Sequence, residues 1–460
     1  MLIVVNARHG SIASVVVVAL VGLQCGPPDA GQPAAATGRP SIIVISIDAL
    51  RRDHVGHYGY ERDVSPYLDR LAEESLVFDR AYAVASWTLI SHMTMMTGLY
   101  PRQHGVVKVD TKISPSIPLL SERLHALGYY TIGLTHGAWL SSRYDFDRGF
   151  DAFRKHRNGA EMNANLREEM AKRPPDRPLY LFLHIWDVHC GNLRARGSTI
   201  FVPPAGYEDL YVADAEERLE GIQAKRLYKG KISATEEQVE ALIALYDGSI
   251  RYVDDLIASW VEEWRADGLL DDALLIVTSD HGEGLWQRDK NEDHGGVHEE
   301  GLRVPLLIRF PGGEHGGERR SELVSHVDLV PTLLDYLEVP REPWIAGRSL
   351  LDELPDDRVI LAERPAERPA VTVTYRWPYK LVSRGDQTWI CDLESDPGER
   401  SLITEWNDPE RHEEISGVVR TAYEALVASW TPVPEGALPL ETQRTQEEIE
   451  ELRDLGYTGE

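Results

Sequence analysis

The stretch Ser41–Ile47, SIIVISI, is followed directly by Asp48. An apolar, β-branched run of this length is typical of a strand that is buried in a parallel sheet. Similar runs occur at 130–134, 179–185, 273–279 and 305–310, and helical patterns such as 235–266 lie between them. This alternation predicts an α/β fold in which helices cover both faces of a large, mostly parallel sheet.

Polar side chains follow three of these strands. They are Asp48, the Asp187/His189 pair and the Asp280/His281 pair. Because α/β sheets bind ligands beyond the carboxyl ends of their strands, we expect the functional site at this edge.

The pattern changes after about Pro340. Short strand-like runs at 358–362, 370–375, 379–384 and 389–393 precede a helical stretch at 409–430. We therefore expect a catalytic domain at 41–340 and a smaller antiparallel α+β subdomain at 341–460. The acidic segment 441–454 is most simply a solvated helix face.

The charge balance limits the partners. The 460 residues include 75 acidic and 48 basic side chains, a formal net charge of −27. Such a field repels nucleic acid and anionic membranes, so neither is expected as a partner. It also repels an anionic ester, so a site for one needs local positive potential, which a bound metal ion supplies most directly.

The N-terminus predicts export. Arg8 and His9 precede an apolar stretch, 11–23, that is too short to span a bilayer and suits a signal peptide at 1–25. Cys25 then precedes a Pro/Ala/Gly-rich tether, 26–40, which resembles a bacterial lipoprotein start, although residues 22–24 make a poor lipobox. A periplasmic or cell-envelope protein is expected, with Cys25 as the candidate for lipid attachment; the alternative is a buried N-terminal helix. With Cys190 and Cys391 the chain has three cysteines, too few for a disulfide framework.

The sequence VTSDHGE places Asp280, His281 and Gly282 directly after a strand. A carboxylate beside an imidazole suits a divalent cation such as Zn or Mn. The competing interpretation is a strand-end turn with a capping aspartate.

The stretch 85–105, ASWTLISHMTMMTGLYPRQHG, carries a candidate nucleophile. Thr88 and Ser91 come before an apolar helical pattern whose N-terminus would favour an anion. A hydroxyl that a metal ion ionises there could attack sulfur or phosphorus. Either residue could instead be a simple helix cap.

From about Pro40 onward the chain resembles the sulfatase family of the alkaline phosphatase superfamily. Eight segments carry the likeness in order: ISIDALRRDHVGHYGY around Asp48, TGLYPRQHG ending at Gly105, GYYTIGL at Gly128, FDRGFDAF at Phe146, SDHGE at Ser279, EEGLRVPLLIRFPG at Glu299, VDLVPTLLDYL at Val327 and ICDLESDPGE at Ile390. The resemblance implies an alkaline-phosphatase-like sandwich and an ester hydrolase.

The nucleophile position departs from the usual pattern. Sulfatases carry Cys or Ser in C-x-P-x-R, ten residues before the Gly that is Gly98 here, and convert it to formylglycine. That position is Thr88, with Ile90 and His92 in place of the Pro and Arg. Formylglycine is not expected. Thr88 is similar to the threonine of related phosphodiesterases, lipoteichoic-acid synthases and phosphoethanolamine transferases, which form a phospho-threonine.

The metal ligands depart as well, since Asp48 is followed by Ala49 where usual sulfatases have a second Asp. The resemblance leaves Asp48, Thr88, Asp280 and His281 as the ligands of one divalent ion. Mn or Zn suits this set better than Ca does. A second metal would need further ligands, for which Asp187 and His189 are candidates.

The resemblance also assigns roles to several histidines. His189 is similar to the histidine that binds the substrate anion. His294 falls where sulfatases have a lysine and could protonate a leaving group, with His298 as its neighbouring competitor. His136 falls where another lysine stands, and His92 could touch the anion. A purely structural role is the alternative for both His136 and His92.

The sequence thus predicts a metal-dependent hydrolase or group transferase that acts on a small-molecule, lipid or glycan ester of phosphate or sulfate. A sulfuric ester hydrolase that works without formylglycine, and a non-catalytic ester-binding relative, are the alternatives. The charged segment 195–231 is expected beside the pocket, in a role that the sequence leaves open.

Overall fold

The computed structural model describes residues 38–137, 139–190, 200–223, 226–227, 231–288, 294, 296–365, 367–443 and 445–446. The expected signal peptide, Cys25 and all but the last three residues of the tether lie outside these residues, as does most of the acidic segment 441–454. Within the described part, the helices are too short or too polar to cross a membrane.

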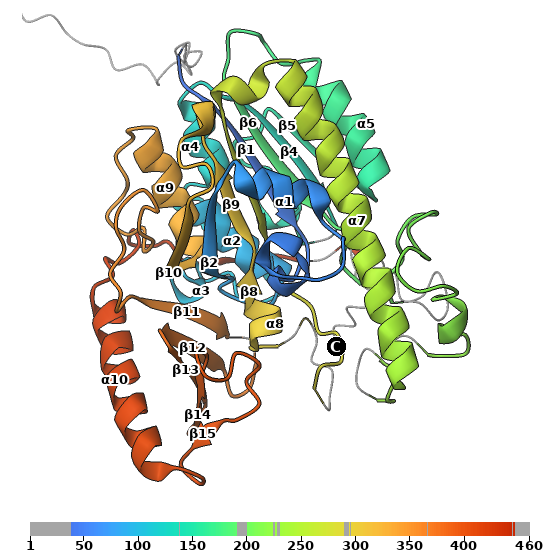
Figure 1. Cartoon of the computed structure of the whole chain (residues 1–460). Coiled ribbons are helices and arrows are strands. Elements are labelled where there is room, and N and C mark those ends of the chain that lie inside the picture. Colours follow the sequence, from blue (N-terminus) through green and yellow to red (C-terminus); the bar gives the residue numbers. More distant parts are fainter. Residues whose placement is uncertain are drawn as a thin grey trace, which may run out of the picture.

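A nine-stranded sheet forms the centre of the molecule (Figure 1). Its strands follow the order β10-β2-β9-β7-β1-β6-β4-β5, with β8 paired to β2. Neighbours are parallel except where β2 meets β8 and β9 and where β7 meets β9. The bounds are β1 Ser41–Ile47, β2 Leu76–Tyr82, β4 Tyr130–His136, β5 Ala152–His156, β6 Leu179–Ile185, β7 Ala273–Ser279, β8 Arg303–Val304, β9 Leu306–Arg309 and β10 Arg319–Ser325.

Strand β1 shows why the sheet has two apolar layers. Successive side chains of a strand point to opposite faces, and all seven residues of β1 are buried. Ile43 and Ile45 join one core cluster, whereas Ile42 and Val44 join the other. One face packs against α1 (Pro66–Glu73), α5 (Gly159–Met170) and α7 (Glu236–Ala266), and the other against α2 (Thr88–Thr97), α4 (Leu120–Ala126) and α9 (Leu329–Tyr336).

A second sheet, fully antiparallel, forms the C-terminal part of the chain. Helix α10 (Pro409–Ala428) contacts its strands β11 to β15. The remaining elements are small. These bounds are β11 Val359–Arg364, β12 Val371–Arg376, β13 Tyr379–Arg384, β14 Gln387–Asp392, β15 Ile403–Thr404, α3 Pro101–His104, α8 Glu299–Leu302 and the pair β3 Thr111–Lys112 and β16 Leu440–Glu441.

A buried ionic cluster joins this C-terminal part to the large sheet. Nζ of Lys380 on β13 lies 3.2 Å from Oε1 of Glu299 on α8 and 2.5 Å from Oε1 of Glu399. The hydroxyl groups of Tyr82 and Tyr375 donate to Glu299 as well. The two parts of the chain therefore share buried polar contacts.

The predicted fold class is confirmed. Strands β1, β6 and β7 have the predicted bounds, and α7 begins one residue after the capping residue Thr235. The strand predicted at 305–310 runs antiparallel to β7, which no apolar pattern reveals. Strands β2, β5 and β10 were not predicted, because each carries charged residues, such as Asp79 and Arg80 in β2, that interrupt the apolar run.

Candidate active site

Two carboxylates emerge side by side from the middle of the sheet. Strands β1 and β7 are parallel neighbours in which Ile47 pairs with Ser279, so the next residues, Asp48 and Asp280, leave the same edge. Oδ1 of Asp280 accepts the backbone N–H groups of Ala49 (3.2 Å) and His281 (2.9 Å). Ala49 has a φ of 59°, a left-handed conformation that turns the chain sharply after Asp48. The two carboxylates are therefore fixed by backbone geometry.

His281 presents a single nitrogen to these carboxylates. Its Nδ1 donates to the carbonyl oxygen of Gly282 at 2.8 Å, so Nε2 is the ring nitrogen that faces the carboxylates. This Nε2 lies 3.7 Å from Oδ1 of Asp48 and 3.6 Å from Oδ2 of Asp280. Gly282 is required here because a Cβ would lie 1.9 Å from the carbonyl oxygen of Glu300.

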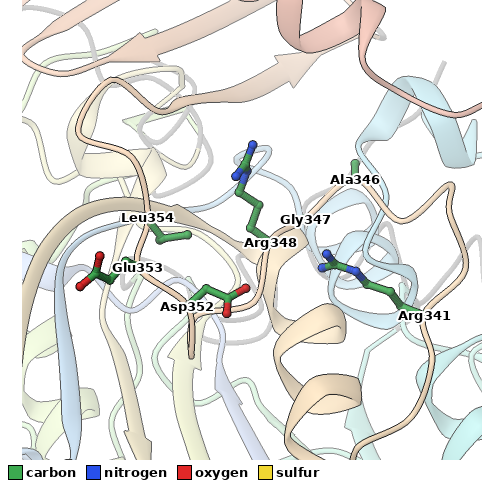
Figure 2. A pocket seen from close by; sticks show the side chains of 7 residues that line it. All are labelled: Arg341, Ala346, Gly347, Arg348, Asp352, Glu353 and Leu354. Carbon is green, nitrogen blue, oxygen red and sulfur yellow. The ribbon is translucent and has the colours of Figure 1, made fainter.

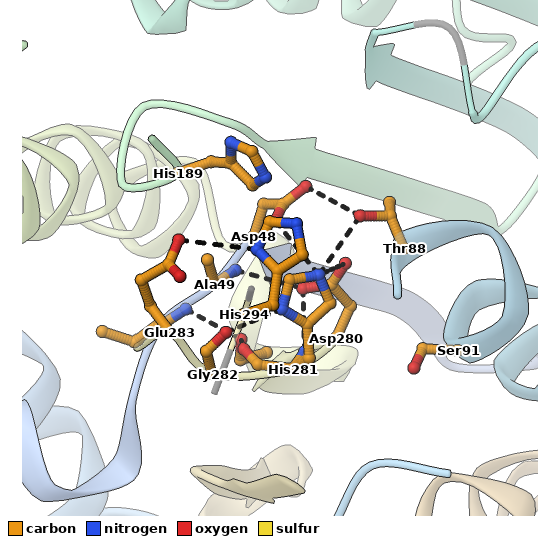
Figure 3. Close-up of polar contacts among 12 residues, drawn as sticks. Asp48, Ala49, Thr88, Ser91, His189, Asp280, His281, Gly282, Glu283 and His294 are labelled. Carbon is orange, nitrogen blue, oxygen red and sulfur yellow. Dashed lines mark hydrogen bonds and ion pairs between the residues drawn. The ribbon is translucent and has the colours of Figure 1, made fainter. Parts of the chain in front are cut away.

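Thr88 completes the group (Figure 3). It is the first residue of α2, whose N-cap is Trp87, and the Ser91 hydroxyl donates to the carbonyl of Ala85. Neither hydroxyl caps the helix. Oγ1 of Thr88 lies 3.3 Å from both Oδ2 of Asp48 and Nε2 of His281. The buried hydroxyl of Thr88 thus faces a carboxylate and an imidazole nitrogen.

The donor set fits a divalent cation. Oδ1 of Asp48 and Oδ2 of Asp280 are shut off from solvent and have no hydrogen-bond partner among the described residues. Burial, reinforced by the charge of Asp280, raises the pKa of Asp48 well above its usual value. Two buried carboxylates that face each other are costly unless a cation lies between them. Asp48, Asp280 and His281 offer three ligand atoms within 4.8 Å of one another, beside Oγ1 of Thr88.

Two further buried histidines lie behind this group. Nε2 of His184 lies 3.1 Å from Oδ2 of Asp48, while its Nδ1 accepts the backbone N–H of His136 at 3.4 Å. Nδ1 of His92 donates to the carbonyl of Thr88, and its Nε2 lies 2.9 Å from Oγ of Ser46. Burial lowers the pKa of His92 to about 3 and that of His184 to about 4, so both are neutral at physiological pH.

His92, His184 and Asp280 also offer three ligand atoms within 4.8 Å of one another, which would suit a second metal ion. The hydrogen bonds favour another role, because both ring nitrogens of each histidine already have partners. The two histidines therefore orient Asp48 and Thr88 from behind. Asp187 and His189, the candidates from sequence for a second metal, belong to neither three-residue group.

His189 and His294 lie next to the cluster in Figure 3, and both are buried. The ring of His294 lies 4.7 Å from that of His281 and 4.9 Å from that of His189, between centroids. Nδ1 of His294 is 3.5 Å from Oε2 of Glu283, and His189 stacks on Trp186. Burial, together with His294 and His281, keeps the pKa of His189 well below its usual value.

The remaining residues predicted from sequence have other contacts. Oδ1 of Asp187 accepts the N–H of Gly159. His136 stacks on Trp186, with its Nε2 3.0 Å from the carbonyl of Arg157. Nδ1 of His298 lies 3.1 Å from Glu399 in the C-terminal part.

Sequence reasoning did not find His184 or Glu283. The signal for His184 was present, because it is a single imidazole within the otherwise apolar and aromatic strand 179–185. Glu283 follows SDHG directly, but no local sequence pattern shows that the folded chain brings it close to His294.

A hollow near the C-terminal part is a poor candidate for the active site (Figure 2). Its lining contains two arginines and two carboxylates but no histidine, serine, threonine or cysteine: Arg341, Ala346, Gly347, Arg348, Asp352, Glu353 and Leu354. It therefore offers neither a nucleophile nor a metal-ligand set.

The mixed sheet between helical layers, with a hydroxyl among Asp and His at its carboxyl edge, defines a hydrolase of the alkaline phosphatase superfamily. Residues 40–339 match the sulfatase family, and the chain belongs to that family. An arylsulfatase of Clostridium perfringens is 22% identical over 68% of this chain and 78% of its own. A choline-sulfatase of Rhizobium meliloti is 24% identical over 80% and 83%. The fold is also that of a phosphonate monoester hydrolase of Agrobacterium radiobacter, with a TM-score of 0.67 and 19% identity over 88% of this chain and all of the other. The protein is accordingly a sulfatase-family ester hydrolase.

Proposed function

We propose that this protein is a metal-dependent hydrolase or group transferase for phosphate or sulfate esters, with Thr88 as its nucleophile. One observation carries the proposal. Oγ1 of Thr88 lies 3.3 Å from both Oδ2 of Asp48 and Nε2 of His281. Next to them, Oδ2 of Asp280 has no hydrogen-bond partner among the described residues. Asp48, Thr88, Asp280 and His281 would hold one divalent ion, Mn or Zn in preference to Ca. When bound, the ion would lower the pKa of the hydroxyl and neutralise charge on the ester.

The residues suggest how the first step proceeds. The Thr88 hydroxyl donates to Oδ2 of Asp48, so its proton has an acceptor in place. The oxygen then attacks phosphorus or sulfur and displaces the alcohol. The first N–H groups of α2 face the position of the transferred group and favour its negative charge. His294 supplies the proton that the departing alkoxide needs, and His189 lies beside it near the transferred group.

The second step releases the product. Water or an acceptor alcohol attacks the Thr88 ester and gives its proton to His294, which lost one in the first step. The bond to Oγ1 breaks, and Thr88 takes its proton back from Asp48. Water makes the protein a hydrolase, whereas an alcohol makes it a transferase. The geometry around Thr88 is the same in both cases.

A threonine in place of the formylglycine residue favours phosphate esters, as in the relatives that use threonine directly. The second candidate is a sulfuric ester hydrolase that works without formylglycine. Similarity to an arylsulfatase and a choline-sulfatase supports this second candidate. Both candidates use the same nucleophile.

Two measurements test the proposal. Rates with an aryl sulfate, an aryl phosphate monoester and a diester, measured side by side, distinguish the candidates. Acid quenching during turnover, followed by mass analysis of the Thr88 peptide, should show added phosphate or sulfate. An unmodified peptide in an actively turning-over, acid-quenched sample would count against a covalent intermediate.

Export stays a proposal from the sequence. The apolar segment 11–23, Cys25 and the tether support a periplasmic or envelope location with a lipid at Cys25. Replacing Cys25 with Ser should move the protein from the membrane fraction to the soluble exported fraction. Recovery of the variant with the membranes would contradict lipid attachment at this residue.

A further inference from the structure

A cavity of about 400 Å³ lies where α5, α7 and the end of β6 meet the segment 200–223. The segment runs beside the lower half of α7 in Figure 1. It packs closely, since a Cβ at Gly248 of α7 would lie 2.2 Å from the carbonyl of Tyr207. Ten residues line the cavity: Asn158, Ala160, Asp187, Val202, Pro203, Pro204, Ala205, Glu208, Glu216 and Tyr252.

The charge of this lining is one-sided. Among the described residues of the lining, three are carboxylates and none is Lys, Arg or His. The hollow in Figure 2, by contrast, balances two carboxylates with two arginines. A cavity that gathers only negative groups favours a cationic occupant.

One oxygen of each of two carboxylates has no hydrogen-bond partner among the described residues. Oδ1 of Asp187 accepts the N–H of Gly159, but its Oδ2 is shut off from solvent and has no hydrogen-bond partner among the described residues. The same holds for Oε2 of Glu208. Burial raises the pKa of Asp187 to about 6. Shielded carboxylate oxygens without donors cost free energy, and a cation that carries N–H or polarised C–H groups would recover it.

The rest of the lining selects the kind of cation. Val202, the two prolines and two alanines give apolar walls, and the Tyr252 ring stands among them. Calcium prefers six to eight oxygen ligands, which these walls do not supply. An organic ammonium group matches them better, because its hydrocarbon part contacts apolar walls and its charge interacts with carboxylates and an aromatic ring.

We propose that this cavity binds an organic ammonium group. Asp187 is two residues before His189, whose ring faces His294 and His281 in the active site. The cavity is therefore built partly from the loop that carries His189, and the bound cation belongs to the alcohol part of the ester. This link to the substrate rests on the proposed function, whereas the binding of the cation does not.

Calorimetric titration of the metal-loaded full chain with choline tests the proposal. The neutral control probe is 3,3-dimethylbutan-1-ol, which has the same shape but no charge. Choline should bind at least about tenfold more tightly than the neutral alcohol, since the difference between them is the attraction of the carboxylates. Equal binding of the two, or no binding of choline, would overturn the proposal.

Variants locate the site. Glu208→Gln keeps the size of the side chain and should weaken choline binding about tenfold or more. Asp187→Asn should do the same, because its Oδ1 can still accept the N–H of Gly159. The matched control is Glu217→Gln, an exposed neighbour outside the lining, which should bind choline as the wild type does. Thermal melts confirm that each variant is folded; choline binding that both cavity variants leave unchanged would contradict the assignment.

Competition distinguishes the two sources of the ammonium group. If it belongs to the substrate, choline competitively inhibits hydrolysis of an aryl sulfate or phosphate ester whose alcohol part carries no charge. If it belongs to a free amine, choline binds without competing, which would contradict the link to the substrate and leave the cation site. A protein that binds choline but hydrolyses no ester would refute the proposed function alone.

Discussion

Nε2 of His184 is hydrogen-bonded to Oδ2 of Asp48 at 3.1 Å. The backbone N–H of His136 points at the other ring nitrogen, so His184 carries its proton on Nε2 and donates it to the carboxylate. Oδ1 of Asp48 is thereby directed towards the proposed metal ion. Partners of this kind commonly hold the orientation of a metal ligand.

Replacing His184 with Leu should weaken metal binding about 10- to 100-fold without changing the number of ions per chain. His184→Gln retains an N–H donor and should lose less. Metal titration followed by elemental analysis measures both quantities. If the wild type holds two ions and the Leu variant one, His184 is itself a ligand.

Replacing Asp280 with Asn should reduce bound metal from one ion per chain to a trace, because a coordinating charge at the centre of the ligand set is lost. The control is Asp352→Asn in the exposed hollow of Figure 2, which should keep the full ion content. Full metal content in the Asp280→Asn variant would refute the ligand assignment.

Replacing Thr88 with Ala should reduce kcat by about 10⁴-fold or more, as expected for loss of a nucleophile. The fold and the metal content should persist, because two carboxylates and His281 remain. Thr88→Ser keeps a hydroxyl and should retain measurable turnover, while Ser91→Ala should lose far less, since its hydroxyl bonds to Ala85. Near-normal turnover of the Thr88→Ala variant would rule out Thr88 as the nucleophile.

The buried His104, away from the active site, should make the folded protein less stable in acid. Burial lowers its pKa in the folded protein to about 3, below the usual 6.5, so the unfolded chain takes up a proton that the folded chain excludes. This contribution to stability is fully present above pH 6.5 and is lost as the pH falls towards the folded pKa. Between about pH 6 and about pH 5, the free energy of unfolding falls by roughly 1 kcal/mol because of this one histidine.

His104→Asn should remove that part of the slope, since the asparagine oxygen can still accept the N–H of Val106. Denaturant unfolding at several pH values gives the comparison. The exposed His315→Asn variant is the control and should show the wild-type slope. An unchanged slope in the His104→Asn variant would show that His104 is protonated in the folded state.

Lys380→Met should destabilise the folded chain by about 3 kcal/mol or more. It removes the positive charge that pairs with the buried carboxylates of Glu299 and Glu399. The control Arg167→Met removes an exposed surface pair with Glu263 and should leave the unfolding midpoint unchanged. Equal midpoints for the two variants would show that water reaches the Lys380 cluster.

The sequence predicted the central strands and their polar ends well, because SIIVISI and its counterparts are apolar on both faces. The resemblance to sulfatases implied that Asp48, Thr88, Asp280 and His281 meet, and the count back from Gly98 singled out Thr88. Sequence reasoning missed β2 and β10, where charged residues hide the strand pattern. It also missed His184, although a single imidazole in an otherwise apolar and aromatic strand was a readable signal. Glu283 contacts His294, and His298 contacts Glu399. No local sequence pattern shows that the folded chain brings these residues together.

The Glu299–Lys380–Glu399 cluster bears on how the protein can be divided. A fragment that ends near residue 340 keeps every proposed metal ligand, yet it exposes Glu299 and the apolar surface around Tyr82 that the C-terminal strands cover. Such a fragment should be insoluble when expressed alone, and limited proteolysis should release no stable catalytic core. We therefore expect that the boundary suggested by composition is not a boundary of folding, and that the two parts must be expressed together.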